Sequence, residues 1–309
     1  DLLSANWEVR YNVPSPGASS LNYATIYSRG IQAFNYGGDS IREDYNLGAY
    51  VVFSNLWGAQ LIGTVRPEFT NDRLTRGGPL ASRPADWQFS SYLATNRTKR
   101  LSATLSMAGR SEFESPGASA GREWTFTFRP RIEYRPTDAL TLTFEPDWVR
   151  AYNSDLFRGT EAAAPGTPGS IDGLLYRFLD YRQESLDLGV RVDWAFSPDF
   201  TLQVVAVPKV DALEFGEVRA LGAARTYDLV PYAGDGGQLA DYTRLSLRGN
   251  AVLRWEWRPG SAFFFVWQQI RDERADEFGG LGVLDDLPDV FGGELTNVFL
   301  VKASYWFGL

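Results

Sequence analysis

The chain has 309 residues and a formal net charge of -8, and 44% of its residues are hydrophobic although the mean hydropathy is -0.25. The apolar residues must therefore be interleaved with polar ones, and no apolar run reaches the roughly 20 residues that a membrane-spanning helix needs. The lack of Cys and His excludes disulfides and thiolate metal sites, and it removes the commonest general base and transition-metal ligand. The acidic balance argues against nucleic acid, which proteins bind through basic surface.

Strict alternation of apolar and polar residues begins near the first residue. In residues 3–13 the odd positions are apolar, from Leu3 through Trp7 to Val13, whereas the even positions are polar. Residues 122–134 and 244–258 repeat the pattern, with aromatic and aliphatic residues facing away from Arg, Glu and Thr. A period of two residues predicts β-strands that have one apolar and one polar face.

The pattern predicts strands along the whole chain, near residues 3–13, 21–35, 44–56, 59–70, 86–97, 100–111, 122–134, 138–151, 174–196, 200–212, 242–258, 261–272 and 296–309. The connections between them are of two kinds. Short turns lie at 55–58, 96–99, 135–138, 197–200 and 258–261, and long polar or Gly/Pro-rich loops lie at 71–85, 112–121, 152–173, 213–241 and 273–295. From the third strand onward, short and long connections alternate, which is typical of a transmembrane β-barrel.

A soluble β-sandwich or a lipocalin-like barrel also has alternating strands. The polar faces here are rich in Arg, Glu and Lys, which a packed core rarely accepts. Trp and Tyr cluster at strand ends, as in the aromatic girdles of membrane proteins. We therefore predict an all-β fold, a transmembrane antiparallel outer-membrane β-barrel with about 13 visible strands and 14 or more in the intact barrel.

Residues 297–309, NVFLVKASYWFGL, alternate up to the last position. A sheet that spans lipid must close, because every backbone N–H and C=O in the hydrocarbon region must be paired. The ending resembles the C-terminal targeting strand of Gram-negative outer-membrane proteins. That resemblance implies an assembly signal at Tyr305, Phe307 and Leu309 that the barrel-assembly machinery reads, with Leu309 at the position that Phe usually occupies.

The number of predicted strands is odd, whereas bacterial single-chain barrels have an even number. Residues 182–186, RQESL, contain no turn-forming residue, so a hidden hairpin within 174–196 is not expected. We therefore expect residues 1–309 to be one outer-membrane β-barrel domain from an N-terminally truncated longer protein. An N-terminal segment or another chain would complete the barrel.

Several segments resemble one family, the bacterial outer-membrane proteins with the C-terminal domain of unknown function 5916. The matching stretches are DRLTRGGP (72–79), NAVLRWEWRPGSAFFFVWQQ (250–269), NVFLVKASYWFGL (297–309) and, more weakly, SPDFTLQVVAVP (197–208). The resemblance implies an outer-membrane barrel that follows an upstream module similar to family 9 carbohydrate-binding domains. That module is absent from these residues, and the family has no established activity.

Charged residues on the polar faces are the candidate functional residues. We expect them to face the barrel lumen: Arg129, Arg131, Glu133, Arg191, Asp193, Arg248, Arg254, Glu256 and Lys302. One interpretation is a charge ladder that tunes the passage of ions or solutes. The other is a network of ion pairs that fills and rigidifies the barrel interior, since opposite charges at this spacing pair across strands.

Two loops offer weaker candidates. The acidic run at 271–291 is either a Ca²⁺ site, since Ca²⁺ binds carboxylate oxygens, or a solvated extracellular loop. We favour the loop, because the spacing of a dedicated calcium-binding loop is missing. TRGGP (75–79) is either a tight turn within its loop or an inward constriction that brings Arg73, Arg76 and Arg83 near the barrel axis.

No catalytic residue, cofactor or metal is predicted, since a Ser–Lys or paired-carboxylate site has no supporting spacing. The first functional hypothesis is a pore or passive transporter for small hydrophilic solutes in the bacterial outer membrane. The alternative is a membrane anchor or assembly partner that displays an upstream carbohydrate-binding module or docks onto another complex. The expected partners are the lipid bilayer with its lipopolysaccharide and the barrel-assembly machinery.

Overall fold

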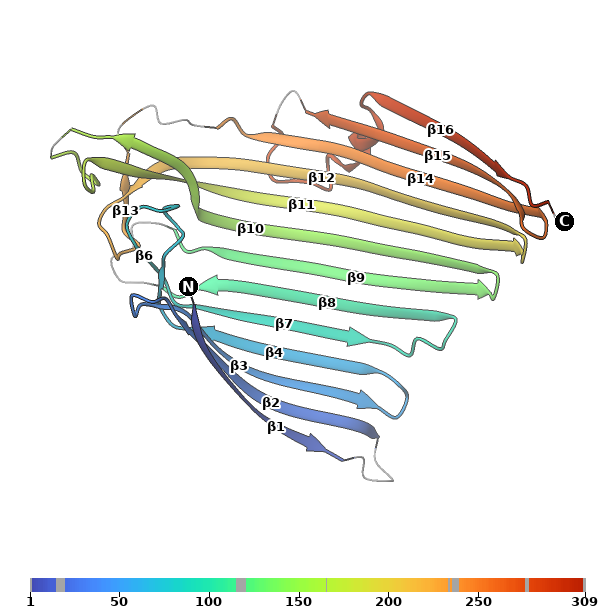
Figure 1. Ribbon diagram of the computed structural model, residues 1–309, viewed down its shortest axis with the longest axis horizontal. Coiled ribbons are helices and arrows are strands. Elements are labelled where there is room, and N and C mark those ends of the chain that lie inside the picture. The colour runs from blue at the N-terminus through green and yellow to red at the C-terminus, as the bar shows by residue number, and fades with distance from the viewer. Residues whose placement is uncertain are drawn as a thin grey trace.

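A computed structural model describes residues 2–14, 20–114, 121–164, 166–232, 234, 239–275 and 278–307. Long antiparallel strands make up nearly all of it (Figure 1). They are β1 (Leu3–Val13), β2 (Leu21–Phe34), β3 (Ser40–Phe53), β4 (Gly58–Arg66), β7 (Asp86–Ala94), β8 (Leu101–Glu112), β9 (Trp124–Thr137), β10 (Leu140–Ala162), β11 (Leu174–Ser197), β12 (Phe200–Leu221), β14 (Tyr242–Arg258), β15 (Ser261–Arg274) and β16 (Leu295–Ser304). The short elements are β5 (Phe69–Asn71), β6 (Ala81–Arg83), β13 (Leu229–Pro231) and the 3-10 helix η1 (Leu287–Phe291).

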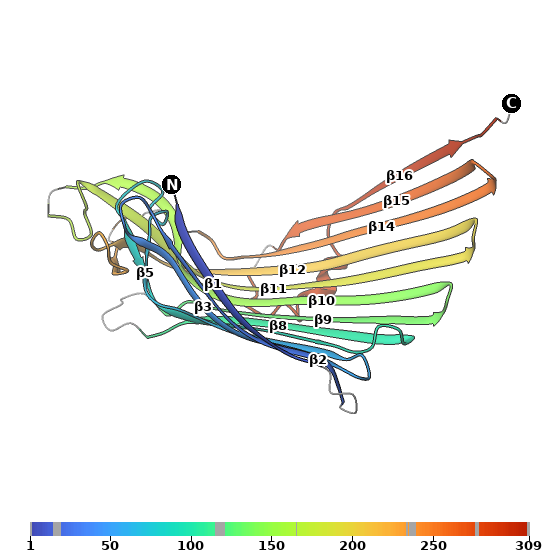
Figure 2. The same cartoon turned by 60° about the horizontal axis from the view of Figure 1, so that its bottom comes forward.

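The long strands pair in chain order from β1 to β16 in one sheet, and β13 adds to it by pairing with β12. The sheet curves into a trough, with β1 along one rim and β16 along the other (Figure 2). Within the described residues each rim strand pairs on one side only, and β1 and β16 are not paired with each other. Because every step along this path is antiparallel and the number of long strands is odd, the two rim strands run in the same direction.

The predicted antiparallel all-β sheet is therefore confirmed, but several predicted strand ends were wrong, and the largest differences concern two strands. Strands β10 and β12 extend to Ala162 and Leu221, well into the predicted loops 152–173 and 213–241. The alternation stops there because the pairing shifts at β-bulges, on β10 after Asn153 and on β12 after Phe215. A bulge adds a residue to one strand and moves its later side chains to the other face, which hides a strand from a search for period two.

The register gives the sheet two different faces. Polar residues lie opposite polar residues across strands, as Arg66 lies opposite Asp86, whereas Leu253 lies opposite Phe265. The hairpin β5–β6 lies on the inner side of the trough, where Arg83 contacts the polar residue Glu123 (Figure 2). The polar face is thus the concave one, and the apolar face is convex.

Two apolar clusters form the core at the end of the sheet that carries the long loops. One lies on the convex face, where the segment with η1 covers the strands, and contains Leu186, Val210, Ala212, Leu245, Leu247, Val283 and Val290. The other joins the hairpin to β11, β12 and β13, and contains Ala81, Tyr176, Phe178, Leu221 and Leu229. No helix among the described residues is long and apolar enough to cross a membrane.

Candidate functional site

The concave face carries rows of arginine–carboxylate pairs. Within a single strand, residues two apart point to the same face and pair, as Arg191 does with Asp193 at 2.6 Å. Arg131 pairs in the same way with Glu133 at 3.1 Å, and Arg254 pairs with Glu256. In each of these three pairs, both charged side chains lie on the concave face and compensate each other.

Other pairs join neighbouring strands. Arg129 on β9 contacts Asp147 on β10 at 2.7 Å, and Arg131 also contacts Glu145 on β10. The structure therefore places the predicted residues Arg129, Arg131 and Glu133 together in one network with β10. Their pairing agrees with the interpretation as a network that rigidifies the wall.

Arg248 and Lys302 differ from the other predicted residues. Both side chains are exposed, and within the described residues neither has a carboxylate partner at ion-pair distance. Lys302 instead lies over the ring of Phe264, 5.9 Å from its centroid. The charges of these two cations are therefore not compensated by a carboxylate within the described residues.

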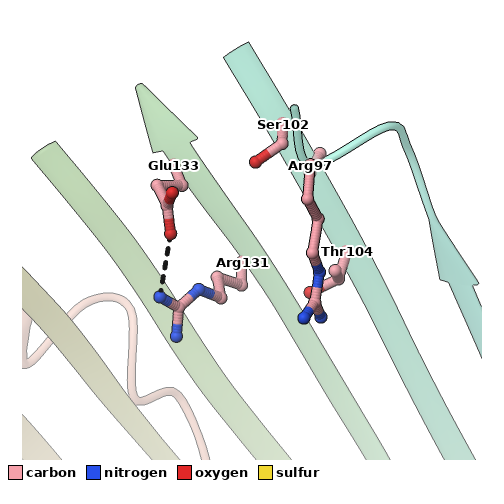
Figure 3. A pocket seen from close by; sticks show the side chains of 6 residues that line it. Arg97, Ser102, Thr104, Arg131 and Glu133 are labelled. Atoms are coloured by element: carbon pink, nitrogen blue, oxygen red, sulfur yellow. Dashed lines mark hydrogen bonds and ion pairs between the residues drawn. The ribbon is translucent and has the colours of Figure 1, made fainter. Parts of the chain in front are cut away.

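Two hollows indent the concave face. The larger, of about 360 Å³, lies over β2, β3, β4 and β7 and is lined by Tyr27, Arg29, Ile31, Arg42, Asp44, Asn46, Ile62, Thr64, Arg66 and Gln88. The smaller, of about 180 Å³, lies near the short turns; Figure 3 shows Arg131 and Glu133 on one side of it and Arg97, Ser102 and Thr104 on the other. Both hollows offer hydrogen-bond donors and acceptors at close spacing, as expected of a surface that contacts hydrophilic solutes.

Two segments cross the concave face at the long-loop end, and we call residues 69–83 and 222–231 together the clasp. The two segments bind each other through backbone hydrogen bonds, from Ser82 N–H to the Thr226 carbonyl at 3.0 Å and from Arg225 N–H to the Leu80 carbonyl at 2.7 Å. The Arg225 guanidinium then pairs with Asp39, in the turn between β2 and β3, at 2.6 Å. The clasp thereby ties β12 to β2 and β3, which lie far apart in the sheet.

The link between Arg225 and Asp39 is electrostatic as well as geometric. Hydrogen bonds from Arg225 and, to a smaller extent, from Asn35 hold the pKa of the Asp39 carboxyl below its usual value. The carboxylate therefore stays charged, and the link stays intact, over the whole neutral range of pH.

Where the clasp meets the sheet, its residue Arg83 is the centre of a buried charge cluster. Its two guanidinium nitrogens bind Glu123 and Asp155, each at 2.7 Å, and the Glu123 side chain is only 2% exposed. Ser154 and the Tyr227 hydroxyl also donate to Glu123, both at 3.2 Å. Burial, and then the nearby carboxylates Glu123 and Asp155, raise the pKa of Tyr227, so this hydroxyl remains a donor.

Of the two alternatives for TRGGP, the structure agrees with the inward fold, because the hairpin lies over the concave face. Gly77 adopts a φ of 100°, and the Arg76 guanidinium lies over the Phe157 ring at 5.2 Å. Arg73 is 92% exposed, whereas Arg83 is held in the buried cluster. The hairpin folds inward, and of the three arginines only Arg73 and Arg76 are exposed at its surface.

Most of this cluster could not be predicted from the sequence. Glu123 belongs to the recognised alternation of β9, but Asp155 lies in a bulge and Tyr227 lies in a loop. Only tertiary contacts bring residues 83, 123, 155 and 227 together. Within the part of the chain that the structure describes, no group of three or more Asp, Glu, His or Cys residues is arranged to hold a metal ion.

The described part of the acidic segment, residues 278–294, does not extend freely from the sheet. Its η1 helix packs on the convex face, where Val283 and Val290 are buried against β12 and β14. Burial, and then repulsion from Asp289 and Asp285, raise the pKa of Asp286. Asp276 and Glu277, also part of the acidic run, lie outside the described residues.

The expected assembly signal lies at the short-turn end. Strand β16 ends at Ser304, earlier than predicted, and Tyr305 accepts a hydrogen bond from Arg258 at 2.7 Å. The rings of Tyr305 and Phe307 meet edge to face, with centroids 4.6 Å apart. Leu309 lies outside the described residues.

No family model, curated protein or solved structure matches this chain. The resemblance to the family with the domain of unknown function 5916 therefore remains an expectation from sequence motifs. What the structure itself defines is an all-β protein with a many-stranded antiparallel sheet, whose concave face is charged and whose convex face is apolar.

Proposed function

We propose that this chain forms the wall of an outer-membrane β-barrel that acts as a pore for small hydrophilic solutes. The observation that carries the proposal is the division of the sheet into two faces. Large apolar side chains are left exposed on the convex face, among them Leu47, Leu61, Ile132, Val190 and Phe299. An exposed apolar surface that extends across a whole sheet marks contact with another apolar medium, and a barrel wall in lipid has this form.

Aromatic residues on the convex face support a membrane position. One row lies near the short turns and includes Tyr134, Trp194 and Trp255. A second row runs from Trp87 through Phe89 and Phe126 to Trp148, with neighbouring centroids 5.9–6.5 Å apart. Trp148 lies opposite Leu186, and Leu186 precedes Trp194 by eight residues on β11. Eight residues of extended strand place the two rows roughly 26 Å apart. An apolar band of about 25 Å between aromatic girdles is the dimension of an outer-membrane barrel.

The concave face supplies the wet side of such a wall. Its ion pairs and polar hollows would be costly inside a packed core, but they are stable next to water. A barrel of 14 or more strands leaves space for an aqueous lumen unless loops fill it.

Single-channel recording in planar lipid bilayers tests this function. The native gene product should give ohmic conductance steps, because a water-filled lumen conducts ions at any voltage of either sign. The rate of osmotic swelling of vesicles that contain the protein should decrease as the size of the added sugar increases. Insertion into the bilayer without any conductance would rule out the pore.

The clasp favours a second candidate, a membrane anchor or assembly partner. Because the clasp crosses the concave face at the long-loop end, it narrows the opening that a solute would use. An anchor whose lumen is blocked would insert in the same way and would show no conductance steps. Removing residues 72–80 from the hairpin separates the candidates, since conductance that rises in this variant indicates a narrowed pore.

A further inference from the structure

We infer that the passage along the concave face prefers anionic solutes, such as small carboxylates and phosphates. This inference rests on the proposed pore and names the class of solute that it passes. It follows from the charges on the concave face, where the carboxylates are paired but some of the cations are not. The excess charge on this face is therefore positive, whereas the net charge of the whole chain is negative.

Carboxylates on the concave face of the long strands are matched by cations. Among the described residues, each carboxylate that shares this face has an arginine or lysine at ion-pair distance. The set comprises Glu8, Asp44, Asp86, Glu112, Glu123, Glu133, Glu145, Asp147, Asp187, Asp193, Asp211, Glu256 and Asp272. Their charge is therefore largely compensated for any solute in the trough.

Cations on the same face are in excess. The register places Arg29, Arg248, Arg274 and Lys302 on the concave face, because they lie beside Asn46, Asn250, Arg244 and Phe264. Within the described residues none of the four has a carboxylate at ion-pair distance; Arg274 and Lys302 lie over the rings of Tyr242 and Phe264. Arg29 lines the larger hollow.

The clasp adds positive charge at the long-loop end. Arg73 is 92% exposed and has only a distant contact of 3.9 Å with Asp72, while Arg76 is exposed over an aromatic ring. The net charge of -8 therefore does not describe the passage. Part of the acidic charge, including Asp285, Asp286 and Asp289, belongs to the segment that packs on the convex face.

The unpaired guanidinium groups on the concave face can bind anions. Arginine remains charged at any relevant pH and presents donors that match carboxylate and phosphate oxygens in pairs. Rings of Arg or Lys set anion preference in aqueous pores, and a confined passage focuses their field on the solute.

Zero-current potentials in a tenfold gradient of KCl, at low total salt, test the inference. The sign should show that chloride is favoured over potassium, by about sevenfold, because roughly one kT of surface potential enriches anions and depletes cations by about 2.7-fold each. The double variant Arg29→Gln/Arg248→Gln should reduce this ratio clearly. The control Arg182→Gln removes an exposed arginine of the convex face, which pairs with Glu214 at 3.2 Å, and should leave the ratio unchanged. A preference for potassium, or an equal shift in both variants, would overturn the inference.

A second measurement does not depend on conductance. The chain has no Cys, so the variant Asn250→Cys carries a single thiol, next to Arg248 on the concave face. In detergent at low salt, the rate of reaction of this thiol is measured with an anionic reagent, ethylsulfonate methanethiosulfonate, and with a cationic one, trimethylammonium-ethyl methanethiosulfonate. Each rate is divided by the rate of the same reagent with free 2-mercaptoethanol, and the normalised rate should be higher for the anionic reagent. Adding Arg248→Gln should remove about half of this preference. If no conductance occurs but the thiol preference holds, the pore fails and the anionic surface preference stands; a cationic reagent preference contradicts the inference in either case.

Discussion

Ion pairs on this sheet have two different energetic roles, which depend on how far each side chain is buried. Arg191 and Asp193 remain 49% and 31% exposed, and an exposed pair of this kind stabilises a fold by about 0.2–1 kcal/mol. Arg83 and Glu123 are 17% and 2% exposed, so the loss of one partner leaves a charge in a poorly solvated place. The concave pairs therefore define the character of the surface, while the pair of Arg83 and Glu123 stabilises structure.

The substitution Arg83→Gln should release the clasp. It leaves Glu123 and Asp155 without their shared cation, and breaking a buried pair of this kind costs about 3–5 kcal/mol. Hydrogen exchange at Ser82 and Arg225, whose amides join the two clasp segments, should then speed up strongly.

The control for this substitution lies in the same hairpin. Arg73 is 92% exposed, so Arg73→Gln should leave the exchange of both amides unchanged. Similar exchange in Arg83→Gln and in the unsubstituted protein would show that the cluster does not hold the clasp.

Two neighbouring positions on β14 test which face meets lipid. Leu253 lies on the convex face opposite Phe265, so Leu253→Arg should reduce the free energy of unfolding by about 2–4 kcal/mol if it lies near the bilayer midplane. Val252→Arg points to the concave face, beside Gln203, and should be tolerated. Unfolding by denaturant in lipid vesicles measures both, and equal losses would reject the assignment of the faces.

At the scale of single elements, three adjacent strands behave differently from the rest. Strands β10, β11 and β12 continue beyond the bulges near Asp180, and their extensions carry the apolar cluster beneath the clasp. The side chains of Phe178 and Leu221 are fully buried there. The extensions are stable because the hairpin β5–β6 and β13 cover their apolar residues. A strand that projects alone into water has no such cover.

The C-terminal segment is an element whose loss should prevent assembly. Deleting residues 305–309 removes Tyr305, which binds Arg258, and Trp306, whose N–H donates to the Ser261 hydroxyl at 2.9 Å. The turn between β14 and β15 then loses its cover, and the expected assembly signal is lost. We expect secretion to continue while folded barrel disappears from the membrane.

Heat modifiability on gels measures this outcome, since folded barrels migrate differently before and after boiling. A deletion of residues 166–168, in the loop between β10 and β11, is the control, because it shortens the chain away from the terminus and leaves the segment with η1 in place. Normal amounts of folded barrel without residues 305–309 would show that the segment is dispensable.

At the scale of the whole molecule, the open rims decide how the sheet is completed. Strands β1 and β16 run in the same direction, so they cannot form an antiparallel pair with each other. In lipid, both rims need a partner for their backbone N–H and C=O groups. We predict that an odd number of further strands, from the same gene product or another chain, lies between them.

Disulfide trapping tests this arrangement, since the chain has no Cys of its own. The double variants Ser4→Cys/Thr296→Cys and Arg10→Cys/Lys302→Cys place thiols on the two rims at either end. They should stay reduced under mild oxidation in membranes, because a disulfide needs Cα atoms about 4.4–6.8 Å apart. The hairpin pair Phe265→Cys/Val301→Cys joins directly opposed residues and serves as the positive control. Rapid disulfide formation between the rims would mean that these strands close the barrel alone.

Local patterns in the sequence determined most of the sheet. The alternation in segments such as Leu3–Val13 and Tyr242–Arg258 fixed both the strands and their faces, because a strand turns successive side chains to opposite sides. The candidate residues of the concave face, including Arg129, Arg191 and Arg254, followed from the same rule, and in the structure each of these three contacts a carboxylate.

Only the tertiary structure decided the features that depend on distant contacts. The bulges opposite Asp180, the clasp and the cluster around Arg83 join residues up to 186 positions apart, as Arg225 and Asp39 are. The packing of Val283 and Val290 on the convex face is of the same kind. Their positions depend on which surfaces remain to be buried once the sheet has curved, and a local period of two residues carries no information about that curvature.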